Sequence, residues 1–212
     1  SNKYIDSDLP QLATYSFDYI GTTIAIDGVY EIRELDLIKD FLVEYHPNAL
    51  KGSCLDIGAN IGNHTVYFSK FFNKVLSFKP NPHSFKLLKV NTENYENIFI
   101  SNFGLSNSRH SATFFTSKSN IGGSGLHGES VDEIQVQLET LDELNLNKEN
   151  ISFIKIDIEG HELQVLDGGS NFFKEYSPIV VFEQHSHEFF QGESLVINKL
   201  KSFGYTSFYC IK

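Results

Sequence analysis

Charged side chains interrupt an otherwise apolar stretch, ISFIKIDIEG, at residues 151–160. Lys155, Asp157 and Glu159 alternate there with isoleucine, and His161 follows directly. An unpaired buried charge is costly, so these side chains either form a structural ion pair of Lys155 with a carboxylate or serve in chemistry. Carboxylates beside a histidine can orient a hydroxyl group and accept its proton. The pattern therefore predicts an acid–base site where this stretch ends.

A second polar group follows the next apolar run, where Glu183, His185 and His187 alternate. These side chains could bind a substrate through hydrogen bonds or hold a divalent metal ion. A His-x-His pair without a third ligand is weak evidence for a metal, so we expect Glu183 and His185 to contact substrate and expect no metal site. His127 lies in the Gly- and Ser-rich segment 118–130, which is either a flap that closes over the substrate or an ordinary loop.

A glycine turn, DIGANIGN, follows an earlier apolar run. Gly58 lets the backbone approach a ligand, and Gly62 permits close contact where a helix begins. We expect Asn60 and Asn63 to cap that helix, whose N–H groups attract anions. Asp56 would accept a hydrogen bond from a cationic or hydroxyl group. Because Asn60 replaces the second glycine of dinucleotide-binding turns, the amino-acid end of a ligand fits better than a pyrophosphate. The alternative is a tight turn without a ligand.

Strand-like and helical segments alternate along the chain from Ser53 onward, and these elements must position the groups described above. Apolar runs separated by helical patterns predict a parallel sheet covered on both faces, with ligands bound at the carboxyl ends of the strands. The sequence thus indicates a doubly wound α/β fold. The expected strands are 53–58, 74–78, 97–105, 151–160, 177–184 and 205–211, and the expected helices are 63–72, 82–94, 161–169 and 193–204.

Two additions to this alternation are expected. Residues 20–32 alternate around Asp27-Gly28 and predict a hairpin, followed by a helix at 33–46. Two strand-like runs, 111–117 and 133–141, form a β insertion between the third and fourth strands. We therefore divide the chain into an N-terminal hairpin and helix, residues 1–50, packed on a main domain, residues 51–212, within one globular unit.

Composition limits the partners of the chain. Its 212 residues suffice for one domain, and a formal net charge of -10 disfavours nucleic acid. No run of 18 uncharged apolar residues is present, so no membrane span is expected. Cys54 and Cys210 fall on strand-like runs and are expected to be buried thiols rather than a disulfide. Together with the lack of a signal-peptide pattern, these features predict a cytoplasmic location. The sequence does not indicate the oligomeric state.

The motifs DIGANIG and KIDIEGHE, with SFKPNPHSFKLLKVN and GLSNS between them, resemble the FkbM-type family of S-adenosylmethionine-dependent methyltransferases. The likeness covers roughly residues 50–185. It implies a Rossmann-like class I methyltransferase fold and O-methylation of a small molecule, typically a sugar or natural-product hydroxyl. It also places the methionine end of S-adenosylmethionine at the glycine turn and adenine near Ser106. The expected cofactor contacts are Asp56, Gly58, Asn60, Gly62, Asn63, Lys79, Asn81 and Ser106.

Methyl transfer from a sulfonium requires aligned donor and acceptor and removal of one hydroxyl proton. His161 is the first choice of base, because the pKa of histidine lies near neutrality. Glu159 and Asp157 are the alternative bases or the groups that orient the hydroxyl. For His161, the competing interpretation is packing at the start of a helix.

Lys79 departs from the family pattern, which usually has glutamate in the SFKPNP segment. A carboxylate there accepts two hydrogen bonds from the ribose diol, whereas an ammonium only donates. Losing a charge-assisted hydrogen bond of this kind weakens the free energy of cofactor binding by roughly 1.5–3 kcal/mol. Cofactor binding is then weakened, or Asn81 binds the diol, or the chain is a binding domain that has lost catalysis. A cation would also suit the 2′-phosphate of NADP in an oxidoreductase, but the glycine turn beginning at Asp56 argues against that cofactor.

Overall fold

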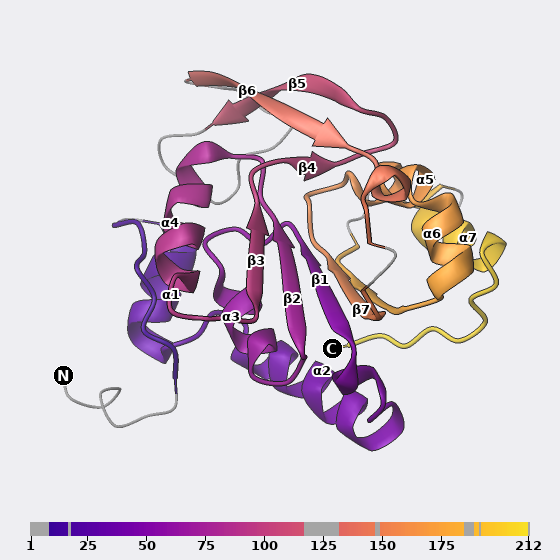
Figure 1. The fold of residues 1–212 in the computed structure, drawn as a ribbon, viewed down its shortest axis with the longest axis horizontal. Helices are drawn as coiled ribbons and strands as arrows, with labels where there is room; N and C mark the ends of the chain where they lie inside the picture. The colour runs from indigo at the N-terminus through magenta and orange to yellow at the C-terminus, as the bar shows by residue number, and fades with distance from the viewer. Residues whose placement is uncertain are drawn as a thin grey trace.

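The computed structural model describes residues 9–16, 18–116, 132–146, 149–184, 189–190 and 192–211. Its centre is a sheet of parallel strands in the order β3-β2-β1-β7-β8 (Figure 1). This arrangement confirms the predicted doubly wound α/β fold. The strands are β1 (Ser53–Ile57), β2 (Lys74–Phe78), β3 (Ile98–Ser101), β7 (Ile151–Ile156) and β8 (Ile179–Phe182).

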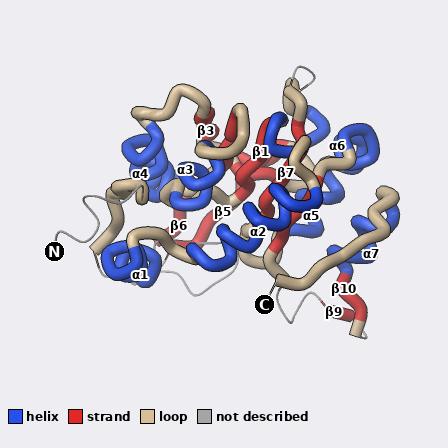
Figure 2. The backbone as a smooth tube through the Cα atoms, turned by 90° about the horizontal axis from the view of Figure 1, so that it is seen from below, coloured by secondary structure: helices blue, strands red, loops and turns tan. Residues whose placement is uncertain are grey.

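Helices cover both faces of this sheet, with α3 and α4 on one side and α5, α6 and α7 on the other (Figure 2). Helix α2 packs on the α3 side through Leu35, Ile38 and Leu42. No helix in the described part of the chain combines the length and the apolarity needed to cross a membrane. The bounds are α2 (Ile32–Tyr45), α3 (Asn63–Ser69), α4 (Pro82–Thr92), α5 (Glu162–Gly168), α6 (Ser170–Tyr176) and α7 (Leu195–Ser202), with short turns η2 (Ala49–Lys51) and η3 (Leu141–Glu143).

The β insertion forms a separate sheet beyond the carboxyl end of β3, in the order β4-β6-β5 (Figure 1). Its strands are β4 (Gly104–Leu105), β5 (His110–Thr116) and β6 (Asp132–Glu139), and a two-stranded ribbon, β9 (Phe189–Phe190) with β10 (Glu193–Ser194), precedes α7. The expected strand 97–105 is wrong as one element, because it divides between the two sheets. Asn102 donates hydrogen bonds to the carbonyls of Lys79 and Pro80, at 2.9 and 3.1 Å, and turns the chain there.

The expected hairpin at 20–32 is wrong, because residues Tyr19–Asp27 form helix α1. Asp18 caps its start by accepting a hydrogen bond from the N–H of Gly21 at 3.3 Å. Gly28 ends the helix with φ 86°, and its N–H bonds to the carbonyl of Ile24 at 2.8 Å. The Asp27-Gly28 pair therefore ends a helix instead of forming a hairpin turn. The alternating isoleucine and threonine residues of this short helix resemble the sequence pattern of a strand.

The expected final strand, 205–211, is also wrong: this segment has no strand, and the described part of the main sheet ends at β8. A side chain anchors the segment instead, since the Tyr205 hydroxyl donates to the carbonyl of Pro178 at 2.7 Å. Cys210 is consequently exposed, contrary to expectation, whereas Cys54 is buried in β1; both are free thiols.

Candidate active site

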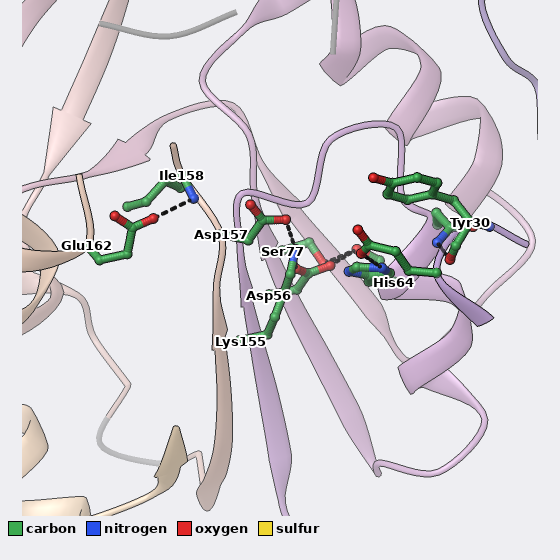
Figure 3. Close-up of polar contacts among 11 residues, drawn as sticks. Tyr30, Asp56, His64, Ser77, Lys155, Asp157, Ile158 and Glu162 are labelled. Atoms are coloured by element: carbon green, nitrogen blue, oxygen red, sulfur yellow. Dashed lines mark hydrogen bonds and ion pairs between the residues drawn. The ribbon is translucent and has the colours of Figure 1, made fainter. Parts of the chain in front are cut away.

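A polar row crosses the centre of the sheet, where Asp56 of β1 pairs in register with Ser77 of β2 and Lys155 of β7. Thr65 of α3 lies over this row, donating to Asp56 Oδ2 at 2.5 Å and contacting Ser77 Oγ at 2.9 Å. Lys155 Nζ lies 3.5 Å from Asp56 Oδ1 (Figure 3). Asp56 has no exposed surface. The cation that Asp56 meets in this structure is therefore Lys155, beneath the glycine turn.

Lys155 also holds Asp157, with Nζ 3.0 Å from Oδ2 (Figure 3). Burial alone would lower the pKa of Lys155, but the charges of Asp157 and Asp56 raise it instead. Burial alone would raise the pKa of Asp157, but the charge of Lys155 lowers it to about 2. The structural ion pair considered from the sequence is thus present. A carboxylate with so low a pKa is a weak base, which favours an orienting role for Asp157.

The glycine turn lies directly against the turn that follows β7. Gly58 has φ 93°, and a Cβ atom there would overlap the backbone carbonyl of Asp157. Gly62 has φ 97°, and its Cβ would lie 2.9 Å from Leu88 Cδ1 of α4. Both positions therefore require glycine for backbone conformation and for close packing. Gly58 in particular brings the ends of β1 and β7 together.

The expected capping by Asn60 and Asn63 is wrong, because the N-cap of α3 is Gly62 and no side chain caps the helix. The Asn63 amide instead binds both backbone polar groups of Tyr30: it accepts from the Tyr30 N–H at 3.0 Å and donates to the Tyr30 carbonyl at 2.8 Å. Asn60 has φ 49°, and its Oδ1 is buried without a hydrogen bond. Asn63 thus fastens the N-terminal segment to the turn.

Asn63→Ala is expected to lower the free energy of unfolding by about 2 kcal/mol, since two hydrogen bonds are lost at about 1 kcal/mol each. Urea unfolding followed by circular dichroism measures this loss. Asn94→Ala, at an exposed position after α4, serves as the control. Equal stabilities of the two variants would contradict the role assigned to the Asn63 amide.

Sequence reasoning missed a cluster formed by Tyr30, Glu31 and His64. Glu31 has a left-handed backbone, φ 56°, at the start of α2, and its Oε2 lies 3.2 Å from His64 Nε2. The Tyr30 ring stacks on His64 with centroids 6.5 Å apart and planes inclined by 15° (Figure 3). Burial alone would raise the pKa of Glu31, but the bond with His64 lowers it. The only signal in the sequence was the proximity of His64 to Gly62.

The turn after β7 holds Glu159 and Gly160 in left-handed conformations, with φ 60° and 88°. Glu162 stabilises this turn by accepting a hydrogen bond from the Ile158 N–H at 3.1 Å (Figure 3). The Glu159 side chain is exposed at the carboxyl end of the strand. Such strained non-glycine conformations cluster at functional sites.

His161 and Ser106, expected as base and adenine contact, lie together. Ser106 Oγ is 3.0 Å from His161 Nε2, and the serine is 1% exposed. This contact links the β4 end of the insertion to the start of α5. His161 thus already has a hydrogen-bonding partner within the protein.

Lys79 is buried, and burial lowers its pKa to about 8, while the charges of Asp157 and Glu159 act in the opposite direction. Asn81 caps α4 by accepting from the His83 N–H at 2.8 Å, and its buried Nδ2 has no hydrogen bond. The oxygen of Asn81 is therefore already engaged, which argues against its serving as the ribose acceptor. Lys79 lies among carboxylates and offsets part of their charge.

The last group of expected residues is described only in part. Glu183 follows β8, its N–H donates to the Ile156 carbonyl at 3.3 Å, and its side chain helps to lower the pKa of Asp157. His127, His185 and His187 lie outside the described residues. Among the residues that are described, no group of three or more His, Cys, Asp or Glu side chains is arranged to hold a metal ion.

Comparison with known proteins identifies the family. The Methyltransferase FkbM domain matches residues 56–207, well over half of the chain. The chain belongs to the FkbM methyltransferase family. A curated relative, the hexuronic acid methyltransferase AglP of Haloferax volcanii, is 31% identical over 170 residues, which cover 76% of this chain and 68% of the relative. Family membership makes S-adenosylmethionine the cofactor of this FkbM domain.

Solved methyltransferases show weaker similarity to this FkbM chain. The FkbM methyltransferase of Methylobacillus flagellatus is 18% identical with a TM-score of 0.45, and the match covers 63% of this chain but 32% of that protein. The precorrin-6y C5,15-methyltransferase of Geobacter metallireducens is 12% identical with a TM-score of 0.46, over 91% of this chain and 82% of that one. The family assignment rests on the domain match and the archaeal relative.

The residues of this FkbM site fit one end of S-adenosylmethionine better than the other. Asn60 Oδ1 is a buried acceptor without a hydrogen-bond donor, and the amino-acid end of the cofactor brings an ammonium that only donates. At the ribose end, Lys79 supplies donors where the diol needs acceptors. The fit is therefore good at the glycine turn and departs from the family pattern at β2.

Proposed function

We propose that the chain is an S-adenosylmethionine-dependent O-methyltransferase acting on a hydroxyl of a sugar, with sugar acids as the first acceptor class to test. The curated relative is named a hexuronic acid methyltransferase, which supports this acceptor class. The observation that carries the proposal is the contact of the glycine turn with the turn after β7, where Gly58 abuts the Asp157 carbonyl. Cofactor-binding and acid–base residues thereby share one edge of the sheet.

When bound, S-adenosylmethionine supplies a methyl group activated by a sulfonium. The turn at Gly58, Asn60 and Gly62 would hold the amino-acid end of the cofactor. Asp157, fixed by Lys155, would orient the acceptor hydroxyl. The remaining proposed roles keep the sequence assignments: proton removal or orientation by His161 and Glu159, cofactor contacts by Lys79 and Ser106, and substrate contacts by His127, Glu183 and His185. Asp56, Asn63 and Asn81 instead support the site through contacts within the chain.

Calorimetric titration with S-adenosylhomocysteine tests the cofactor, and we expect binding in the micromolar range, with NADPH as the negative control. Mass spectrometry after incubation with S-adenosylmethionine and a glucuronic-acid acceptor tests the reaction. A methyl ether survives mild alkali, whereas a methyl ester on the carboxylate is hydrolysed, so alkali treatment separates hydroxyl from carboxylate methylation. Binding of NADPH in place of S-adenosylhomocysteine would reject the proposal.

A second candidate, a methyltransferase-fold binding domain without catalysis, is favoured by one observation, the buried Lys79 at the expected ribose contact. It predicts no methylated product with any sugar acceptor and no gain in S-adenosylhomocysteine binding on Lys79→Glu.

From the sequence, we also propose a cytoplasmic location for the protein.

A further inference from the structure

Two carboxylates from distant parts of the chain flank the glycine turn, one in contact with a histidine and the other with a lysine. Glu31 Oε2 lies 3.2 Å from His64 Nε2, and Asp157 Oδ2 lies 3.0 Å from Lys155 Nζ. The side chain of Glu31 is 37% exposed and that of Asp157 is 32% exposed, so both retain surface toward solvent. Each carboxylate is thus fixed in place and still accessible to a ligand.

Glu31 is held in an unfavourable conformation by its surroundings. Its φ of 56° is a left-handed value that costs free energy in a residue other than glycine. The Asn63 amide grips both backbone groups of the preceding residue, Tyr30, and the Tyr30 ring stacks on His64. Backbone strain of this kind persists only where surrounding contacts impose it. Here those contacts hold the Glu31 carboxylate beside the glycine turn.

The turn and the two carboxylates beside it together favour a positively charged hydrogen-bond donor. The charge of Asp157 opposes ionisation of Glu31, although the bond with His64 leaves the pKa of Glu31 lowered, so the two carboxylates repel each other. In the turn itself, Asn60 Oδ1 is buried and has no hydrogen bond. A primary ammonium carries three N–H donors, a positive charge and no acceptor. It would relieve the repulsion and supply the missing donor together.

We propose that the Glu31 carboxylate binds the α-ammonium of the methyl donor. This inference rests on the proposed function and deepens it, since it assigns a contact to a residue outside the matched domain, residues 56–207. Tyr30, Asn63 and His64 are positioning residues that hold the Glu31 carboxylate. The segment before β1 therefore belongs to the cofactor site.

Calorimetry with two ligands tests this contact. The first ligand is S-adenosylhomocysteine, and the second is its deaminated analogue, in which hydrogen replaces the α-ammonium. Glu31→Gln is expected to weaken binding of S-adenosylhomocysteine by about 10- to 100-fold, the usual effect of losing a charge-assisted hydrogen bond. Binding of the deaminated analogue should change less than about threefold. Glu34→Gln, at an exposed position on α2, is the matched control and should leave both affinities unchanged.

Glu31→Gly separates binding from folding. Glycine adopts a positive φ without strain, so this variant should fold at least as well as the wild type in a thermal melt while losing the same ammonium-dependent affinity. Equal weakening of both ligands by Glu31→Gln and Glu31→Gly, or no weakening of either, would overturn the inference while leaving the cofactor assignment standing. Failure of the wild-type protein to bind S-adenosylhomocysteine would overturn the proposed function as well.

Discussion

Lys155→Met is expected to lower the free energy of unfolding by about 3–5 kcal/mol, the usual cost of removing one partner of a buried ion pair. Asp56 has no exposed surface, and without Lys155 its carboxylate would keep only the hydrogen bond from Thr65. Asp157 would lose its 3.0 Å ion pair in the same step. Methionine has a similar length, so the effect reports loss of charge rather than loss of volume.

Urea unfolding at neutral pH measures this loss, and Lys86→Met, at an exposed position on α4, is the control. The double variant Lys155→Met/Asp56→Asn should recover part of the stability, because it removes the uncompensated carboxylate as well. A single variant within about 1 kcal/mol of the wild type would show that water or other groups solvate Asp56, and would contradict the account of the polar row.

Lowering the pH should reduce the difference in the free energy of unfolding between Lys155→Met and the wild type. The folded pKa of Asp157 is about 2, below the value near 3.9 for an unfolded chain, because Lys155 stabilises the carboxylate. A lowered folded pKa contributes stability above the unfolded pKa, and this contribution is lost as the pH falls from about 4 to about 2. The variant lacks this contribution, so its curve of stability against pH should be flatter over that range.

The local parts of this site could be predicted from the sequence. A strand that ends in a glycine turn and a helix is recognisable because alternation and glycine act over a few residues. The same alternation put Lys155 and Asp157 on one face of a strand, and their ion pair is present. The partner of Asp56 could not be predicted, because it depends on the register between β1 and β7, which are joined only by non-local hydrogen bonds.

Errors arose where side chains, rather than periodicity, determine the path of the backbone. Asp18 and Gly28 cap α1, although the intervening residues alternate like a strand. Asn63 binds the backbone of Tyr30 instead of capping its own helix. Because the sequence pattern predicts a hairpin at residues 20–32, nothing in it indicates that Glu31 lies near the glycine turn. The contacts that complete the site therefore came from the segment whose local pattern was most misleading.

Lys79→Met is expected to stabilise the protein by about 1–3 kcal/mol at neutral pH, opposite in sign to Lys155→Met. Burial lowers the pKa of Lys79 to about 8 from its usual value of 10.5, so the charged form is less favourable in the folded chain than in the unfolded chain. Attraction to Asp157 and Glu159 offsets only part of this cost. Methionine removes the charge and keeps the apolar stem, which should raise the Tm by several degrees.

The gain from Lys79→Met should depend on pH in a defined direction. Below about pH 8 both the folded and the unfolded wild type carry the Lys79 proton, so the gain is constant. Between about pH 8 and 10.5 the folded wild type releases this proton first and recovers stability, so the gain should shrink. Melts of both proteins at pH 7 and pH 10 measure this, with Lys86→Met as the exposed control. A variant less stable than the wild type would mean that the surrounding carboxylates need the ammonium. Lys79 would then be a structural cation.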